Sequence, residues 1–415
     1  MAETKIGVYT ELPGGKPPVR VGTLWAVGDR ARQGAKFEYD AAWLAHPQGY
    51  GLEPALPLGR GVQYTRHALF GCMADSSPDR WGRTLMKRAE ADRAREAAES
   101  PRWMSEADYL LRVCDTARQG ALRYSLDGGA TFLDNRAENA VPPLVDLRKL
   151  QHAVDNTVED KAGDTDLQLL LAPGSSLGGA WPKACVRDER GRLCIAKFSR
   201  ADEESDVVAW EAVALQLARA AGLSVPPFRL ETLVAGGRRR HVLVVEKFDR
   251  GPAGERIPYL SAMSLLDAED GDRRSYLELA EAMQPSCVDY RRQLRELWRR
   301  MAFNHLVCNT DDHMRNHGFL RLRPGGWELS PLFDVNPTPP SAAPRDRATP
   351  LTPEGEAVNR ETLLECCTSF HLRLSEAQDA WTRLQNAVAG WRAAASAFRI
   401  PKREQDRMAD AFTTR

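Results

Sequence analysis

The sequence lacks several features that would assign it to a simple class. Its eight cysteines include no Cys-x-x-Cys pair and no zinc-like spacing, which predicts reduced thiols and a cytoplasmic protein. No apolar run reaches membrane-spanning length, and the first residues lack the apolar core of a signal peptide. Charge of one sign is not in excess, since 57 Lys and Arg balance 57 Asp and Glu. This balance argues against a chain that binds nucleic acid by bulk charge.

The chain is nevertheless long enough, at 415 residues, for two or three packed lobes. Alternating apolar residues predict a small β unit over 5–45, and Ser77 followed by Pro78 predicts the start of a helix. The next elements are expected in this order: a strand near 170, a Gly- and Ser-rich turn over 171–183, strands over 184–187 and 193–198, a helix over 205–222 ending at Gly222, and strands over 228–233 and 241–248. This is the order of a protein-kinase N-lobe.

After residue 250 the strands give way to helices. A helix over 290–306 leads directly into the polar run 304–318. Within that run, Asp311 and Asn316 have the spacing of the kinase catalytic loop, where an Asp holds the acceptor hydroxyl and an Asn holds a metal ion. Asp334 follows a strand-like run further on, where a kinase places its second metal-binding Asp. In this order the three residues predict phosphoryl transfer.

Other interpretations of these residues stay open. The polar run is also compatible with an ordinary surface loop, and Asp334 alone with a turn residue before a proline. A metal site built from Asp311, Asp312, His313 and His317 is a rival, although the upstream His pair of a metallohydrolase is missing. We expect Asp312 and His313 to brace the loop through hydrogen bonds instead.

A phosphate-binding site also needs a loop whose backbone can come close to the phosphate, and a positively charged side chain. The glycines of 174–179 suit the loop, because backbone N–H groups reach a phosphate only where side chains are absent. Lys197, in the apolar strand Ile-Ala-Lys-Phe, resembles the Val-Ala-Ile-Lys strand of protein kinases, with Glu211 as its helix partner and Lys183 as a second cation. A simple turn, an edge-strand lysine and a solvated glutamate are the ordinary alternatives. The segment from Glu246 to Phe248 is the expected adenine hinge.

Four separated segments closely resemble the HipA family, the Ser/Thr kinases of bacterial type II toxin–antitoxin modules. They are Ser176-Leu-Gly-Gly-Ala-Trp-Pro-Lys183, Val245-Glu-Lys-Phe-Asp249, Asn309-Thr-Asp-Asp-His-Met-Arg-Asn-His-Gly318 and Phe333-Asp-Val-Asn-Pro337. The run from Cys114 to Leu122 and the first β unit look like that family's N-terminal subdomain. The resemblance implies an α+β, protein-kinase-like two-lobed fold, with a β-rich N-lobe, a helical C-lobe and a small N-terminal β-containing subdomain. The implied domains are 1–125, 126–249 and 250–415.

The resemblance also implies roles at matching positions. Asp311 is then the catalytic residue, Asn316 and Asp334 bind Mg²⁺, and Lys197 binds ATP. Ser176 falls where the family has its autophosphorylated loop serine, with Ser175 as an adjacent alternative. The nucleotide-binding set implied for this chain is Ser176, Gly178, Gly179, Lys183, Lys197, Glu246, Phe248 and His313.

The implied partners are a helix-turn-helix antitoxin of the HipB type and a protein substrate, for which an aminoacyl-tRNA synthetase is one candidate. Operator DNA is expected to be reached only through the antitoxin, and no membrane is involved. Two other functions remain in view. One is a small-molecule kinase of the aminoglycoside-phosphotransferase type, which needs no loop serine. The other is a non-catalytic scaffold that binds a repressor.

Overall fold

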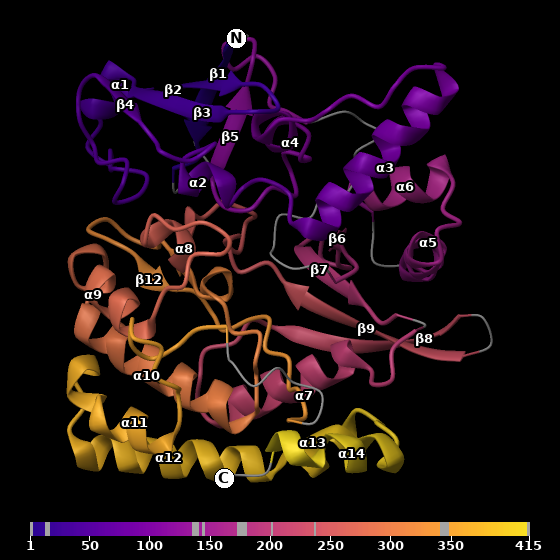
Figure 1. Ribbon diagram of the computed structural model, residues 1–415, viewed down its shortest axis with the longest axis vertical. Helices are drawn as coiled ribbons and strands as arrows, with labels where there is room; N and C mark the ends of the chain where they lie inside the picture. The colour runs from indigo at the N-terminus through magenta and orange to yellow at the C-terminus, as the bar shows by residue number, and fades with distance from the viewer. Residues whose placement is uncertain are drawn as a thin grey trace. The chain divides into compact units, whose positions relative to one another are not determined.

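The computed structural model describes residues 3–12, 17–134, 141–142, 146–171, 181–200, 202–235, 238–340 and 348–412. Figure 1 shows the helices and strands of the chain, which divides into two compact units. The first unit comprises Met1–Ala201, Leu233–Arg240 and Val244–Leu260, and the second comprises Asp202–Thr232, His241–Leu243 and Ser261–Arg415. The domain boundaries predicted at 125 and 249 stay a prediction.

The first unit begins with a five-stranded antiparallel sheet. Its strands, in spatial order, are β4 (Val62–Tyr64), β3 (Gln33–Tyr39), β2 (Val19–Gly28), β1 (Glu3–Thr10) and β5 (Leu122–Ser125). The register places Ile6 opposite Leu24, and Leu24 opposite Phe37. All three side chains are fully buried. This apolar row across three strands is the centre of the buried face, since side chains alternate between the two faces of a strand.

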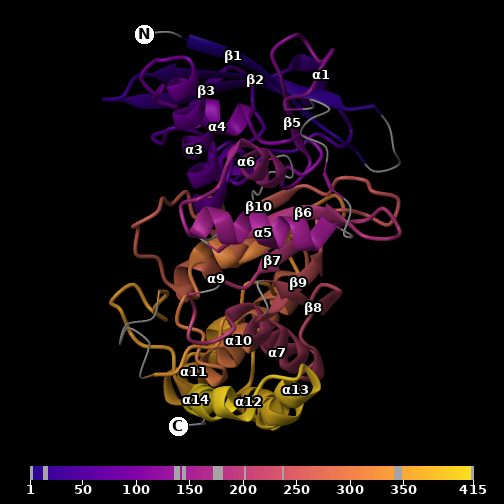
Figure 2. The same cartoon turned by 90° about the vertical axis from the view of Figure 1, so that its right-hand side faces the viewer.

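Helices follow the first strands of this unit. They are α1 (Ala41–Leu44), α2 (Gly71–Ala74), α3 (Arg80–Glu96), α4 (Glu106–Leu111), α5 (Leu147–Val158) and α6 (Asp164–Leu171). The N-cap of α3 is Asp79, whose side chain accepts a hydrogen bond from the Gly82 N–H, so the helix starts later than Ser77 and Pro78 predicted. The strand predicted near 170 is wrong, because α6 is a helix that buries Leu167 and Leu170 and packs on α3 and α5 (Figure 2).

The second sheet contains the predicted N-lobe strands in the order β6 (Lys183–Arg187), β7 (Leu193–Phe198), β9 (Arg238–Glu246) and β8 (Phe228–Ala235). The predicted hairpin of β6 and β7 is confirmed, and its register pairs Lys183 with Lys197. The predicted helix is α7 (Val207–Ala220), and Gly222 follows its end with a φ of +72°, a conformation that glycine adopts without a steric penalty.

The second unit is mainly helical. Its helices after residue 260 are α8 (Ala262–Leu265), α9 (Tyr276–Ser286), α10 (Tyr290–Leu306), α11 (Arg360–Glu365), α12 (Leu374–Ala389), α13 (Trp391–Ala397) and α14 (Lys402–Met408). Short 3₁₀ helices are η3 (Met314–Asn316), η4 (Cys367–Phe370) and η5 (Ala409–Phe412). Strand β11 (Gly318–Leu320) is the middle strand of a three-stranded sheet whose order is β10 (Tyr259–Ser261), β11 and β12 (Glu328–Leu329). α10 packs on α9 and α12, and α7 packs on α12 and α13 (Figure 2). None of the described helices is both long and apolar enough to span a bilayer.

The predicted helix over 290–306 is confirmed as α10. Leu294, Leu297, Trp298 and Met301 are fully buried, as their helical spacing predicts. The Trp298 indole N–H donates to the Leu363 carbonyl oxygen at 2.8 Å. α10 therefore forms a fixed support for the polar residues that follow it.

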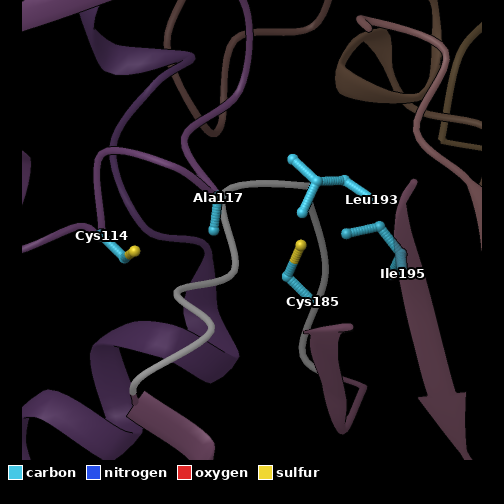
Figure 3. Packing of buried hydrophobic residues seen from close by; sticks show 5 residues of the cluster. All are labelled: Cys114, Ala117, Cys185, Leu193 and Ile195. Atoms are coloured by element: carbon cyan, nitrogen blue, oxygen red, sulfur yellow. The ribbon is translucent and has the colours of Figure 1, made fainter. Parts of the chain in front are cut away.

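Apolar side chains join the segment after α4 to the second sheet. Cys114 and Ala117 pack with Cys185 of β6 and with Leu193 and Ile195 of β7 (Figure 3). All five are buried, and Cys185 is completely so. The segment that resembled the family's N-terminal subdomain thus shares a core with β6 and β7 inside one compact unit.

A substitution at Gly22 tests the close packing within the first sheet. A Cβ there would lie 2.3 Å from the Glu38 carbonyl oxygen and 2.5 Å from the Phe37 ring. We expect Gly22→Ala to lower the free energy of unfolding by about 2 kcal/mol, the usual cost of overpacking. Urea denaturation measures this. Gly34→Ala, in the same sheet with no atom within 4 Å, is the control and should change stability by no more than about 0.5 kcal/mol. Equal losses in both variants would contradict the steric argument.

Candidate active site

The polar run begins where α10 ends. Cys308 adopts a left-handed conformation with a φ of +50°, and the Asn309 N–H donates to the Asn304 carbonyl oxygen at 2.9 Å. The chain therefore leaves the helix axis sharply. The Asn309 side chain extends the turn, with its Nδ2 3.4 Å from Asn304 Oδ1. Because of this turn the chain does not continue the helix, and the residues after 309 lie beside the end of the buried α10.

The Asp312 carboxylate is the central acceptor of the loop. It accepts hydrogen bonds from Asn304 Nδ2 at 2.7 Å and from the Tyr276 hydroxyl, and it pairs with His317 Nε2 at 3.0 Å. The Thr349 hydroxyl donates to the Asp312 carbonyl oxygen at 2.6 Å. The loop is therefore tied to α9, to α10 and to the segment around 349. The prediction that Asp312 braces the loop is confirmed.

The environment of Asp312 favours its ionised form. Burial raises the pKa of this carboxyl, but the His317 ring and the hydrogen bonds from Tyr276 and Asn304 lower it by more, so the pKa lies below the usual value. The carboxylate is thus a buried charge that its neighbours compensate. Such a group fixes the local conformation, because any rearrangement leaves it without donors.

Asn316 is oriented from the same loop. Its Nδ2 donates to the Asp311 carbonyl oxygen at 3.0 Å, and the His313 N–H donates to the same oxygen at 3.1 Å. Asn316 is only 5% exposed, yet its Oδ1 has no hydrogen-bond donor among the described residues. A buried acceptor of this kind normally has a partner. The Asp311 side chain, by contrast, is exposed.

The segment carrying Asp334 lies against this loop. Asn309 and Pro337 form an isolated β-bridge, and the Thr338 N–H donates to the Cys308 carbonyl oxygen at 3.1 Å. Asp334 itself is half-buried and adopts a left-handed conformation with a φ of +58°. Such a conformation is uncommon outside glycine and recurs at functional sites. The structure therefore brings the segment of Asp334 to the loop of Asp311 and Asn316.

The rival metal site is not supported. Among the residues that the structure describes, no three His, Cys, Asp or Glu side chains lie together as a metal-binding group. Asp312 and His317 are paired with each other, and Asp312 also accepts from Tyr276 and Asn304. An oxygen site at Asn316 and Asp334 has the ligand type that Mg²⁺ prefers, and the unsatisfied Asn316 Oδ1 fits such a site.

The two candidate lysines belong to the first unit. Lys183 Nζ lies 2.9 Å from Asp79 Oδ2, and both side chains are 2% exposed. Asp79 thus neutralises Lys183 while it caps α3. Lys197, opposite Lys183 in the β6–β7 register, is half-buried. Glu211 is buried on α7 in the second unit, so its pairing with Lys197 stays a prediction.

The expected hinge continues the strand ladder of the second sheet. The Lys247 N–H donates to the Leu193 carbonyl oxygen at 2.9 Å, and Glu246 Oε2 lies 2.6 Å from Arg192 Nη1. The Phe248 ring lies 6.3 Å from that of Tyr259. The expected hinge is thus held by a main-chain hydrogen bond to β7, by an ion pair with Arg192 and by a ring contact with Tyr259. The candidate loop residues Ser175, Ser176, Gly178 and Gly179 lie outside the described residues.

Sequence reasoning missed Tyr276 and Thr349 as supports of the loop. Tyr276 precedes Asp312 by 36 residues and Thr349 follows it by 37. No spacing rule connects such positions, and only the fold brings them together.

The Asp312 network generates a stability prediction. Removing one partner of a buried charge pair costs about 3 kcal/mol or more, so Asp312→Ala should lower the free energy of unfolding by that amount at pH 7. Because the folded pKa is lower than the unfolded value of about 3.9, this contribution is present above that pH and lost on acidification. Urea denaturation at several pH values measures it. The exposed Asp311→Ala is the control, and equal losses would refute a specific role for Asp312.

Two family models match the chain. The HipA N-terminal domain matches residues 18–124, and the HipA-like C-terminal domain matches residues 175–392. A search of curated proteins finds no match. Among solved structures, the chain is similar to a chain in the complex of the Shewanella oneidensis MR-1 toxin–antitoxin system HipA and HipB with its operator DNA. The two sequences are 16% identical, and the TM-score is 0.67. The similarity covers 99% of this chain and 95% of that chain.

A second solved structure, the Helicobacter pylori proinflammatory kinase CtkA, has 14% identity, with 55% of this chain and 92% of that chain covered and a TM-score of 0.37. The Shewanella structure shows the fold, so the predicted α+β, protein-kinase-like two-lobed fold with a small N-terminal β-containing subdomain is confirmed. The C-terminal family model alone spans more than half of the sequence, and the chain therefore belongs to the HipA family.

Proposed function

We propose that this protein is an ATP- and Mg²⁺-dependent protein Ser/Thr kinase that acts as the toxin of a type II toxin–antitoxin system. Family membership supports the general class. The observation that carries the proposal is the loop after α10. There a braced Asp312 network presents an exposed Asp311 and a buried, unsatisfied Asn316 Oδ1 beside the segment of Asp334.

In the proposed reaction, the hydroxyl oxygen of the acceptor attacks the γ-phosphorus of ATP. The bond from this phosphorus to the oxygen bridging the β- and γ-phosphates breaks, and ADP leaves. The Asp311 carboxylate accepts the hydrogen bond of the acceptor hydroxyl and takes up its proton. The main chain of Asp311 is held by two donors while its side chain is exposed, which suits a group that orients an incoming substrate.

Asn316 and Asp334 are the residues that we propose to hold Mg²⁺. Bound there, the ion would neutralise charge on the phosphates. Asn316 Nδ2 donates to the Asp311 carbonyl oxygen, and this bond directs Oδ1 away from that oxygen. Lys197 is the proposed phosphate-binding cation, and the main chain of Glu246 and Phe248 the proposed adenine contact. Lys183 and His313 are also proposed to contact the nucleotide.

Regulation and partners belong to the same proposal. Ser176 is the proposed autophosphorylation site, because a phosphate there adds about two negative charges next to a site for another polyphosphate. The Shewanella complex contains HipA, HipB and operator DNA, which supports a HipB-type antitoxin as partner and DNA contact through it. The protein substrate would be a cytoplasmic protein whose phosphorylation stops translation, such as an aminoacyl-tRNA synthetase.

The kinase proposal predicts the effect of three substitutions. Asp311→Ala, Asn316→Ala and Asp334→Ala should each lower the incorporation of γ-phosphate from labelled ATP by about 10²–10⁴-fold. EDTA should abolish incorporation and added Mg²⁺ restore it. The exposed Asp379→Ala on α12 is the control and should retain wild-type activity. Label that survives in all three site variants would defeat the proposal.

Phosphopeptide mapping tests the loop serine. After incubation of the wild-type protein with ATP, we expect phosphate on Ser176, and Ser176→Ala should remove it while Ser175→Ala should not. Ser176→Ala should also keep its activity for longer during incubation with ATP, because it escapes self-inactivation. An unmodified loop together with phosphate transfer to an aminoglycoside would favour a small-molecule kinase instead.

A further inference from the structure

A cluster of buried charges lies at and just beyond the expected hinge. The Lys247 side chain is fully buried, and those of Asp249 and Arg250 are 1% and 7% exposed. Lys247 Nζ lies 3.3 Å from Asp249 Oδ1, and Arg250 Nη1 lies 2.8 Å from Asp249 Oδ2. One carboxylate thus faces two cations inside the first unit. The proposed nucleotide contacts account for none of these side chains.

The partners of this cluster come from the segment 116–120. Lys247 Nζ donates to Gln119 Oε1 at 2.9 Å, and the Gly120 N–H donates to Asp249 Oδ2 at 2.7 Å. Arg250 Nη2 donates to the carbonyl oxygens of Thr116 and Arg118, at 3.1 and 2.8 Å. Each of the three charged side chains is therefore bonded to a segment about 130 residues earlier in the chain.

The segment 116–120 is itself rigidly held. The fully buried Arg118 guanidinium donates to four carbonyl oxygens, those of Ser76, Leu110, Val113 and Leu133. Gly120 has a φ of +74°, and a Cβ there would lie 3.2 Å from the Tyr259 nitrogen. Ala117 packs against the β6–β7 strands (Figure 3). The hinge is thus bonded to a segment with little freedom to move.

The charge state of the cluster is consistent with an ion pair. Burial raises the pKa of Asp249, but Arg250 and Lys247 lower it by more, so the carboxyl is ionised at neutral pH. Burial lowers the pKa of Lys247, and Asp249 opposes this. Apolar residues of similar volume often stabilise a core as well as a buried ion pair does. Stability alone therefore does not account for charges at this place.

We propose that Asp249 is a positioning residue for nucleotide binding, which ties the hinge to the segment 116–120 and so fixes the main chain that contacts adenine. The inference rests on the proposed kinase function. Its physical basis is that main-chain recognition requires the Glu246 and Phe248 peptide groups at one fixed place. Side-chain identity at those two positions contributes little to such recognition. The fit to adenine therefore depends on contacts that hold the hinge main chain in place, such as those with the segment 116–120.

The test compares nucleotide kinetics in Asp249→Asn and Gln119→Leu. Asp249→Asn keeps an acceptor for Gly120 but removes the charge between Lys247 and Arg250. Gln119→Leu removes the Lys247 acceptor without a change of charge, and it serves where Asp249→Asn fails to fold. In either variant we expect the KM for ATP to rise about tenfold, with kcat changed less than about twofold, because the lost interaction affects binding and not the reacting groups.

A matched control separates positioning from stability. Glu90 on α3 is a buried carboxylate in the same unit, 5% exposed and 2.8 Å from Arg93, and it lies outside the hinge cluster. Glu90→Gln should lower the melting temperature without raising the KM for ATP. Preference for ATP over GTP should fall in Asp249→Asn and Gln119→Leu and stay unchanged in Glu90→Gln.

The outcomes are distinct. A folded Asp249→Asn or Gln119→Leu with wild-type KM and nucleotide preference would overturn the positioning role while leaving the kinase function intact. An equal rise of KM in Glu90→Gln would also overturn it, since the effect would then follow general destabilisation. A wild-type protein that binds no adenine nucleotide in calorimetry with ATP and Mg²⁺ would refute the kinase function and this inference together.

Discussion

The buried carboxylate of Asp312 is the interaction on which the candidate site depends. Its hydrogen bonds come from Asn304 at the end of α10 and from Tyr276 at the start of α9, and its ion pair is with His317. An unpaired charge at this depth would be prohibitively costly, so the loop has few alternative conformations. The exposed Asp311 and the buried Asn316 then project from a backbone that is already fixed. Preorganisation of this kind is what phosphoryl transfer requires, because its catalysis is mostly positioning and charge stabilisation.

Much of the fold could be predicted from local sequence patterns. The α10 helix, the β6–β7 hairpin and the glycine end of α7 each follow from apolar periodicity or from one turn residue, and all three are confirmed. A strand is expected near 170, where the structure has the end of α6, because a short apolar run does not distinguish a strand from a helix. The buried leucines at 167 and 170 have helical spacing. The start of α3 was misplaced because Ser77 and Asp79 are both good N-caps, and only the hydrogen bond to Gly82 decides between them.

Sequence patterns could predict only the part of the candidate site that lies within one loop. The spacing of Asp311 and Asn316 belongs to one loop, so a resemblance to a family can suggest a role for each of them. The supports of that loop, Tyr276 and Thr349, lie more than 30 residues away in opposite directions. Their roles depend on the packing of the second unit, which no periodicity encodes. The same holds for Asp249, whose partners lie at 116–120.

Buried charges also fix how the residues before 134 pack against strands β6 and β7 within the first unit. The side chains of Lys183 and Asp79 are each 2% exposed, and neither charged group could be buried without the other. The same reasoning applies to Asp249, which needs the Gly120 N–H, and to Lys247, which needs Gln119. An apolar contact such as that of Ala117 tolerates small displacements, whereas an unpaired buried charge does not. The apolar cluster therefore supplies much of the attraction, and the ion pairs fix the register of the N-terminal segment against the strands that carry Lys183 and Lys197.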